Sequence, residues 1–300
     1  MQDFIQHIIN GISLGSIYAL IALGYTMVYG ILKMINFAHS DVYMVGAFAA
    51  YYIARWLGVD SSPGIATLVT LLMASMICCS LLGLTIERLA YRPLRKAPKL
   101  NILITAIGVS LFLEYSGQLV FGADPKVFPE VMRDFTLFSM AGVELKSFDI
   151  TVLVVSLIAM VALQFLIFKT KLGKAMRAVS SNASVASLLG VNPDRIITFT
   201  FIVGSALAGI GSVLVGMKYP KIDPLMGMMI GLKAFVAAVL GGIGNVGGAV
   251  LGALIMGLSE EMVVAYVSST YRDALAFGIL IVILIFRPAG LLGKYSVEKV

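Results

Sequence analysis

The chain has 300 residues, of which 59% are hydrophobic and 13% are charged, and its mean hydropathy is +0.97. A soluble domain could not bury so much apolar surface, because even large domains leave much of their chain exposed to water. The formal net charge of +6 fits basic loops that face anionic lipid, so we expect membrane lipid and no nucleic acid among the partners. The composition therefore predicts a multi-pass membrane protein.

Long apolar runs predict an all-α bundle of about eight membrane spans, some of them broken or re-entrant, because a helix needs about 20 apolar residues to cross the hydrocarbon core. The expected spans are 8–32, an interrupted run that ends at Trp56, 64–90, 102–121, 150–168, 196–217, 228–266 in two pieces, and 274–286. The first residues lack a basic region and a small-residue cleavage site, so no removable signal peptide is expected.

The first span is rich in small residues, including Gly11 and Gly15. Small residues at this spacing let the backbone of a second helix approach closely. Lipid-facing helices usually carry larger side chains. We therefore expect the first span to be buried inside the bundle.

Basic residues assign the loops to the two sides of the membrane. Lysine and arginine dominate residues 88–99 and 169–195, so the positive-inside rule places both segments in the cytoplasm. The loop 122–149 has no positive excess and is expected on the outer side. Pro93 and Pro98 are expected to stop any helix from crossing the first cytoplasmic loop.

The cytoplasmic segment 169–195 contains the signals of a short amphipathic helix at 183–189. Asn182 is a suitable N-cap, Gly190 a suitable C-terminal stop, and Pro193 a suitable first residue for the next helix. Such a helix is either a docking surface for a soluble partner or an ordinary interfacial connector. The spacing alone leaves both open.

Two of the apolar runs are interrupted. Polar residues at 36–41 break the second run, although charged side chains at the centre of a span cost roughly 2.5–3.5 kcal/mol each. Glycines crowd residues 241–248 and predict a turn between helical pieces at 231–240 and 249–262. Broken helices line substrate cavities in transporters. We therefore expect a translocation path between the two breaks, formed by Asn36, His39, Ser40, Asp41, Gly241, Gly242, Gly244 and Asn245.

Other interpretations of both breaks stay open. The polar residues could form a cap at the cytoplasmic surface beside Lys33, and the glycines could be a close packing seam. Glu114 lies well inside the fourth expected span, where a carboxylate is a functional candidate. It could equally be solvated near the outer surface or pair with Tyr115.

No nucleophile–base pair or cluster of metal ligands is recognisable in the sequence. Cys78 and Cys79 are adjacent inside an apolar run and are expected to be inert small side chains. We therefore expect no catalytic residues and no metal site.

Six segments, in this order, are similar to one known family. They read GISLGSIYALIALGYTMVYGILKMINFAHSD, IERLAYRPLR, TKLGKAMRA, ASLLGVNPDR, KAFVAAVLGGIGNVGGA and RPAGLLG. Together they closely resemble the LivH-type permease of bacterial branched-chain amino acid ABC importers, across nearly the whole chain.

The resemblance implies one type II-like transmembrane permease domain over residues 1–300, in the bacterial inner membrane. It implies a heterodimer with a second permease, two cytoplasmic ATP-binding subunits, and a periplasmic amino-acid-binding protein for Leu, Ile and Val. ATP and Mg would be bound by the partner subunits, so no cofactor is expected on this chain. The chain would supply a transport path and would not be an enzyme.

The resemblance also implies a role for the cytoplasmic segment. ABC importer permeases carry a loop of the pattern Glu-Ala-Ala-xxx-Gly that docks on the ATPase. With its glycine placed at Gly190, only Ala186 also matches, and Ser184 stands where the family has glutamate. The expected coupling loop therefore docks by shape and apolar contact, through Asn182, Ser184, Val185, Ala186, Leu188, Leu189 and Gly190.

Two other functions stay open. A urea or short-chain amide permease shares several of the same segments. A proton-coupled secondary amino acid transporter would need an acid–base relay inside the membrane, for which the sequence offers only His39, Asp41 and Glu114.

Overall fold

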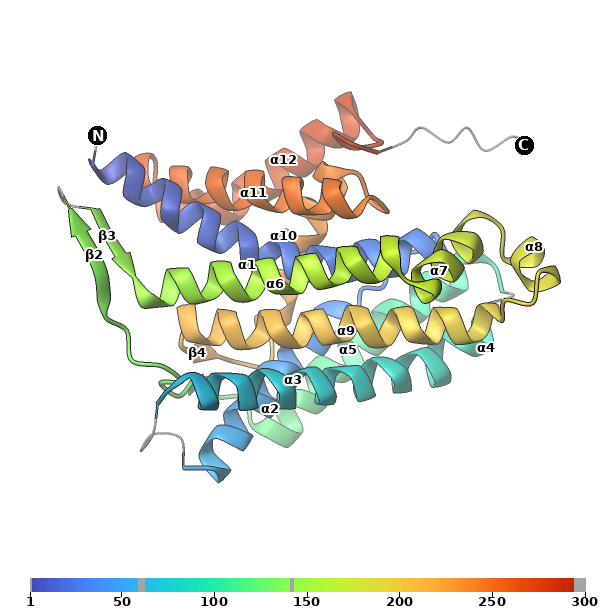
Figure 1. Ribbon diagram of the computed structural model, residues 1–300, viewed down its shortest axis with the longest axis horizontal. Coiled ribbons are helices and arrows are strands. Elements are labelled where there is room, and N and C mark those ends of the chain that lie inside the picture. Colours follow the sequence, from blue (N-terminus) through green and yellow to red (C-terminus); the bar gives the residue numbers. More distant parts are fainter. Residues whose placement is uncertain (1, 59–62, 96, 141–142, 294–300) are drawn as a thin grey trace.

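The longest helix, α1 (Gln2–Leu32), runs through the middle of the bundle (Figure 1). The computed structural model describes residues 2–58, 63–95, 97–140 and 143–293. α1 packs mainly against α11 (Val246–Tyr266) and α9 (Pro193–Lys218). A helix that is covered on most sides needs no polar stripe, which fits the mostly apolar sequence of α1 after Asn10.

Helices dominate the rest of the chain. In chain order they are α2 (His39–Trp56), α3 (Ile65–Ile86), the π-helical turn η2 (Glu87–Tyr91), α4 (Arg92–Leu94), α5 (Lys99–Phe121), α6 (Ser147–Lys169), α7 (Lys171–Ser181), α8 (Ala183–Leu188), α10 (Met226–Gly241), the 3-10 turn η3 (Ser269–Tyr271) and α12 (Arg272–Phe286). Among the described residues, seven helical segments are long and apolar enough to cross a membrane, and α10 is a shorter apolar helix. The predicted all-α membrane bundle is confirmed.

Four short strands were not expected from the apolar runs. β1 (Lys126–Val127) pairs antiparallel with β4 (Lys221–Ile222), and β2 (Thr136–Met140) pairs antiparallel with β3 (Val143–Lys146). All four lie in the loops that follow α5 and α9. Backbone groups in these loops have no helical partners, so they pair with each other as strands.

Different elements lie at the two ends of the bundle. One end carries the N-terminus of α1 and the β2–β3 hairpin, and the other carries α7 and α8 (Figure 1). The basic residues of α4 and α7 gather at the second end, which the positive-inside rule makes cytoplasmic. α1 therefore starts on the outer side, where the backbone N–H of Glu144 donates to the Gln6 side chain at 2.9 Å.

No helix crosses the described part of the first cytoplasmic loop, as predicted, since α4 ends at Leu94 and α5 begins at Lys99, but Pro93 itself lies inside the helical run. In η2 the backbone N–H of Arg92 bonds to the carbonyl of Glu87, five residues back, which makes the turn wider than an α-helical turn. The proline then occupies the first turn of α4, where a missing backbone N–H costs nothing. Pro98 directly precedes α5.

Glycines bring α1 and α11 into direct contact, as the spacing of Gly11 and Gly15 predicts. A methyl group on Gly15 would lie 2.8 Å from Cα of Leu254, and one on Gly11 would lie 2.9 Å from Cα of Leu258. Gly257 on α11 likewise faces the backbone of Gly15. This close approach supplies the packing contacts that hold helices together inside lipid.

Replacing Gly257 with alanine should therefore destabilise the protein, because overpacking against backbone costs about 1–3 kcal/mol. The matched control is Gly278→Ala in α12, where an added methyl group meets open space. We expect a lower melting temperature in detergent for Gly257→Ala and an unchanged or slightly higher one for Gly278→Ala. Equal melting temperatures for the two variants would contradict the proposed seam.

Candidate functional site

The helical structure is interrupted between α1 and α2, at residues 33–38. Lys33 ends α1 with a positive φ of 55°. The four polar residues of the predicted path in this region, Asn36, His39, Ser40 and Asp41, are all buried. They therefore lie inside the protein and do not form a cap at the cytoplasmic surface.

His39 fills a gap that Gly24 leaves in α1. Any side chain at Gly24 would collide with the imidazole ring, and Tyr25 meets the same ring edge-on with the ring centroids 4.9 Å apart. Gly24 lies about 12 Å before the end of α1, at 1.5 Å per residue. The start of α2 is therefore at membrane depth. Within the described chain, Nε2 of His39 has no hydrogen-bond partner.

Two glycines of α10 bring its backbone against the start of α2. A methyl group on Gly227 would lie 2.6 Å from the carbonyl oxygen of Ser40, and one on Gly231 would overlap Cβ of Ser40. The Ser40 hydroxyl donates to the carbonyl of Phe37 at 2.8 Å, which closes the turn that begins α2. The break is thus held between α1 and α10.

Asn36 and Asp41 bond to two further helical segments. The side-chain oxygen of Asn36 accepts a hydrogen bond from the Tyr91 hydroxyl of η2 at 2.7 Å. Oδ2 of Asp41 accepts from the Ser110 hydroxyl of α5 at 2.5 Å, whereas its Oδ1 has no partner among residues 2–58, 63–95, 97–140 and 143–293. Because an unpaired oxygen is costly in a dry interior, this place is suited to a polar ligand or water.

A cavity of about 160 Å³ opens beside the break, between α1, α5 and α10. Of the predicted path residues, Ser40 lines it directly, and Asp41 is one hydrogen bond away through Ser110. Glu114 also lines it; that residue is 7% exposed and has no hydrogen-bond or ion-pair partner in the described part of the chain. The lining comprises Tyr25, Phe37, Ser40, Ile107, Ser110, Leu111, Glu114, Met228, Leu232 and Phe235.

The glycine-rich break lies elsewhere, at the cytoplasmic end of the α10–α11 hairpin. Gly241 and Gly248 touch backbone to backbone, and Gly242, with a φ of 105°, packs against Gly293. Asn245 caps α11 by accepting from the Gly248 N–H at 3.2 Å and donates to the Leu292 carbonyl at 2.8 Å. This is the geometry of a packing seam.

None of the four predicted path residues in this seam lines the cavity beside Ser40. Gly244, with a φ of 93°, lies next to Gly30 near the cytoplasmic end of α1. The predicted turn between two helical pieces is confirmed, with α10 ending at Gly241 and α11 starting at Val246.

The cytoplasmic segment folds as its capping signals predict. The Asn182 side chain accepts from the Val185 N–H at 3.0 Å and begins α8. Gly190 has a φ of 83°, and the Val191 N–H bonds to the Ala186 carbonyl at 3.0 Å, which ends the helix. Within the expected coupling loop, Ala186 is buried, whereas Ser184, Val185, Leu188, Leu189 and Gly190 are exposed.

An ion network that runs from the half-exposed Asp194 to the buried Glu87 connects this segment to η2. Asp194, in the first turn of α9, pairs with Arg95, which also pairs with Glu87 of η2. Glu87 is fully buried, and its second oxygen accepts from the Thr198 hydroxyl at 2.8 Å. A contiguous set of polar contacts therefore runs from the end of the coupling segment to the turn that holds Asn36.

Comparison with known proteins identifies the family. The sequence profile described as "Branched-chain amino acid transport system / permease component" matches residues 7–284. The chain is 44% identical over 306 residues to the high-affinity branched-chain amino acid transport system permease protein BraD of Pseudomonas aeruginosa, covering 100% of this chain and 99% of BraD. The chain belongs to the branched-chain amino acid transport permease family.

Two proteins of Salmonella typhimurium are also similar to this permease. The high-affinity branched-chain amino acid transport system permease protein LivH is 42% identical over 303 residues, with 99% of this chain and 98% of LivH covered. The permease protein LivM, which carries the same system name, is 25% identical over 293 residues, with 92% of this chain and 68% of LivM covered. Multiple apolar spans and this family membership make the chain a multi-pass protein of the bacterial inner membrane.

The permease holds a second ion network that was not predicted. Glu260 of α11 is fully buried, accepts from the Tyr18 hydroxyl and from Lys233 at 2.9 Å each, and pairs with Arg272. Lys233 also reaches Asp273 at 2.7 Å. The sequence contained a signal for this network, because Lys233 and Glu260 are charged residues inside apolar runs and such charges need partners. Which residues become the partners depends on how α1, α10, α11 and α12 pack.

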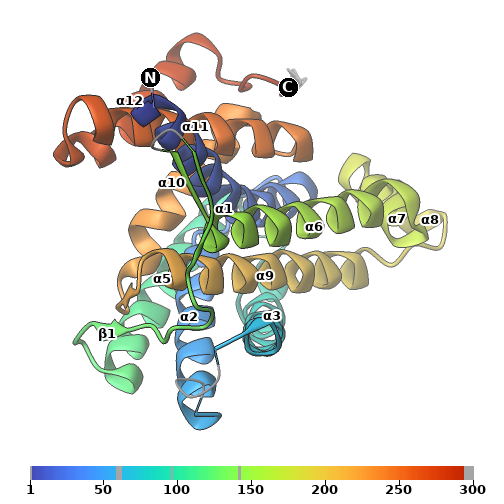
Figure 2. The same ribbon diagram turned by 60° about the vertical axis from the view of Figure 1, so that its left-hand side comes forward.

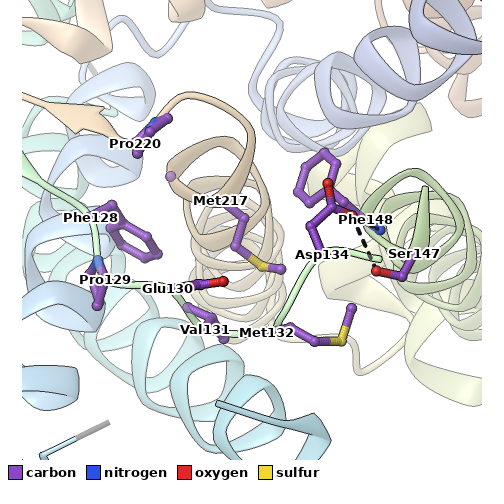
Figure 3. Close-up of a pocket in the computed structure, with 11 residues that line it drawn as sticks. Phe128, Pro129, Glu130, Val131, Met132, Asp134, Ser147, Phe148, Met217 and Pro220 are labelled. Carbon is purple, nitrogen blue, oxygen red and sulfur yellow. Dashed lines mark hydrogen bonds between the residues drawn. The ribbon is translucent and has the colours of Figure 1, made fainter. Parts of the chain in front are cut away.

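An outer pocket of about 270 Å³ lies where α6 begins and α9 ends (Figure 3). Asp134 accepts hydrogen bonds from the Ser147 hydroxyl at 3.2 Å and from the Phe148 N–H at 3.3 Å. Its carboxylate therefore holds the first turn of α6. The pocket shares no lining residue with the cavity beside Ser40.

In the described part of the permease, no group of three or more His, Cys, Asp or Glu side chains could hold a metal ion. Cys78 and Cys79 are free thiols, and the buried Cys79 donates to the Val42 carbonyl at 3.3 Å. Both behave as small side chains within α3.

Proposed function

We propose that this chain is a permease subunit of an ATP-driven importer that carries leucine, isoleucine and valine into the cytoplasm. The observation that carries the proposal is the identity of 44% and 42%, over essentially full length, to two permeases named for high-affinity branched-chain amino acid transport. The chain acts as one transmembrane domain that supplies a transport path and catalyses no reaction itself.

The complete importer contains a second permease, two cytoplasmic ATP-binding subunits and a periplasmic amino-acid-binding protein. The second permease is supported by the similarity to both LivH and LivM, two permeases named for the same system in one organism. ATP and Mg are bound by the ATP-binding subunits, and this chain carries no cofactor of its own.

The coupling loop at 182–190 docks on an ATP-binding subunit. Support comes from its place at the cytoplasmic end, from the caps of α8, and from three exposed apolar side chains on α8 and its C-cap residue. Val185, Leu188 and Leu189 are 50%, 87% and 75% exposed outside the membrane spans, where apolar side chains favour contact with a partner.

The translocation path follows the cavity beside Ser40, with Asn36, His39 and Asp41 behind its wall. The free oxygen of Asp41 and the free nitrogen of His39 support this placement. Gly241, Gly242, Gly244 and Asn245 contribute by allowing the α10–α11 hairpin to close at the cytoplasmic end of the path.

Movement of the coupling loop reaches the path through Asp194, Arg95 and Glu87, and then through the hydrogen bond from Tyr91 to Asn36. The π-helical turn η2 between Glu87 and Tyr91 is a local irregularity of the kind that occurs at functional sites. A shift of α9 would thus pull on the break between α1 and α2.

Uptake by the complete importer tests the substrate. In cells that lack their own importers, we expect uptake of labelled leucine that isoleucine and valine inhibit and that excess urea or acetamide leaves unchanged. Uptake should cease when the ATP-binding subunits are inactivated by mutation. Uptake that survives this inactivation but collapses with a protonophore would contradict the proposal and favour a secondary transporter.

Leu188→Asp tests the docking of the coupling loop. Burying a leucine contributes about 1.5–3 kcal/mol, so the charge should weaken binding of the ATP-binding subunits by about tenfold or more. Val127→Asp is the matched control, because Val127 is 78% exposed at the opposite end, on strand β1. Co-purification of the ATP-binding subunits is the measurement, and an equal yield with both variants would refute the contact.

Tyr91→Phe tests the link between the coupling loop and the path. It leaves the buried oxygen of Asn36 without its donor, at a cost of about 1–3 kcal/mol. We expect normal co-purification of the ATP-binding subunits but severalfold less leucine transported per ATP hydrolysed. The control Tyr115→Phe removes a hydroxyl from an exposed side chain of α5. If both variants transport equally, the link has no role in coupling.

A further inference from the structure

Glu114 differs from the other fully embedded glutamates in having no partner. Glu260 is paired with Lys233 and Arg272, and Glu87 with Arg95. Glu114 is 93% buried, yet no hydrogen bond or ion pair joins it to any residue of the described chain. An ionised carboxylate at membrane depth is costly unless an opposite charge meets it, so a positively charged group from outside the chain is a suitable complement.

The carboxylate of Glu114 lines a cavity whose two serine hydroxyls are held by hydrogen bonds. Ser110 and Glu114 are separated by one helical turn, so both side chains lie on the face of α5 that lines the cavity. The Ser110 hydroxyl donates to Asp41, whose second oxygen is unpaired and buried. This hydrogen bond fixes the position of Ser110 and places a second carboxylate behind it.

Apart from Ser40, the remaining lining is aliphatic and aromatic, and no lysine, arginine or histidine is part of it. Ile107, Leu111, Leu232 and Met228 form walls to which a branched hydrocarbon side chain can pack. The volume of about 160 Å³ equals that of several water molecules at about 30 Å³ each, which is the scale of a small amino acid.

We propose that this cavity is the site where the permease holds its substrate, with the ammonium group of the amino acid at Glu114 and Ser110 and its branched side chain against α5 and α10. This assignment rests on the proposed function. Because the lining has no basic residue, the substrate carboxylate faces the open side of the cavity. Holding only one end by charge keeps the site weak enough for the substrate to leave.

The first test is transport by the complete importer in proteoliposomes. Glu114→Gln keeps the shape of the side chain and should lower leucine uptake at least tenfold, while Glu114→Asp should retain part of it. Tyr115→Phe, on the exposed side of α5, should leave uptake unchanged. Unchanged uptake with Glu114→Gln would overturn the site. So would failure of Glu114→Gln to assemble with the second permease, because the carboxylate would then be a subunit contact.

The second test does not depend on which substrate is carried. In the complete importer with Cys78→Ala and Cys79→Ala, Ser110→Cys places a single thiol in the cavity. A cationic trimethylammonium methanethiosulfonate should modify it at least tenfold faster than the anionic sulfonate reagent, and Glu114→Gln should remove this preference. Ser116→Cys, on the exposed face of α5, is the matched control and should respond to neither the charge nor Glu114.

The two tests separate the two proposals. If the wild-type importer carries no branched-chain amino acid but Ser110→Cys still prefers the cationic reagent through Glu114, the ammonium site stands and the proposed substrate is wrong. If leucine is transported but the reagent preference is the same with and without Glu114, the proposed function stands and the ammonium site is wrong.

Discussion

The absence of water from the hydrocarbon core governs this structure more than any other condition. A carboxylate in that region needs a cation, several donors or a wet cavity. Glu260 meets the condition with two cations and a tyrosine, and Glu87 with an arginine and a threonine. Asp41 has one serine, and Glu114 has no partner in the described chain. The paired carboxylates join helices to each other. Of the poorly paired ones, Glu114 lines the cavity and Asp41 is one hydrogen bond from it through Ser110, which is why function is proposed there.

Two glycines, which have no side chain, determine where that cavity forms. The imidazole of His39 packs against Gly24 of α1, and Ser40 packs against Gly231 of α10. A larger residue at either position would push the start of α2 outward and separate Asp41 from α5. Close packing at glycine also holds α1 against α11, where Gly15 and Gly257 are in contact. The seam between α1 and α11 therefore provides a fixed frame, against which the break and α5 define the site.

Helix positions and caps were predictable because each depends on local chemistry: apolar length, and single residues such as Asn182 and Gly190. The burial of residues 36–41 was not decidable, because it depends on contacts with Gly24, Tyr91 and Ser110, which are distant in sequence. For the same reason the glycine-rich turn looked like a second path segment, although its residues pack against residues 289–293. Pro93 lies one residue before the end of the helical run, because the wider π-helical turn before it accommodates a residue without a backbone N–H.

The missing glutamate of the coupling loop is a departure from the pattern of ABC importer permeases, and its energetic weight is small. An exposed ion pair contributes about 0–1 kcal/mol, because water already solvates both charges. Leu188 and Leu189 are largely exposed, and each would contribute about 1.5–3 kcal/mol if an ATP-binding subunit covered it. Apolar docking on a helix with fixed caps can therefore replace the ion pair. If the proposed docking moves α8, its fixed caps would favour transfer of that displacement to α9 and Asp194 over local bending.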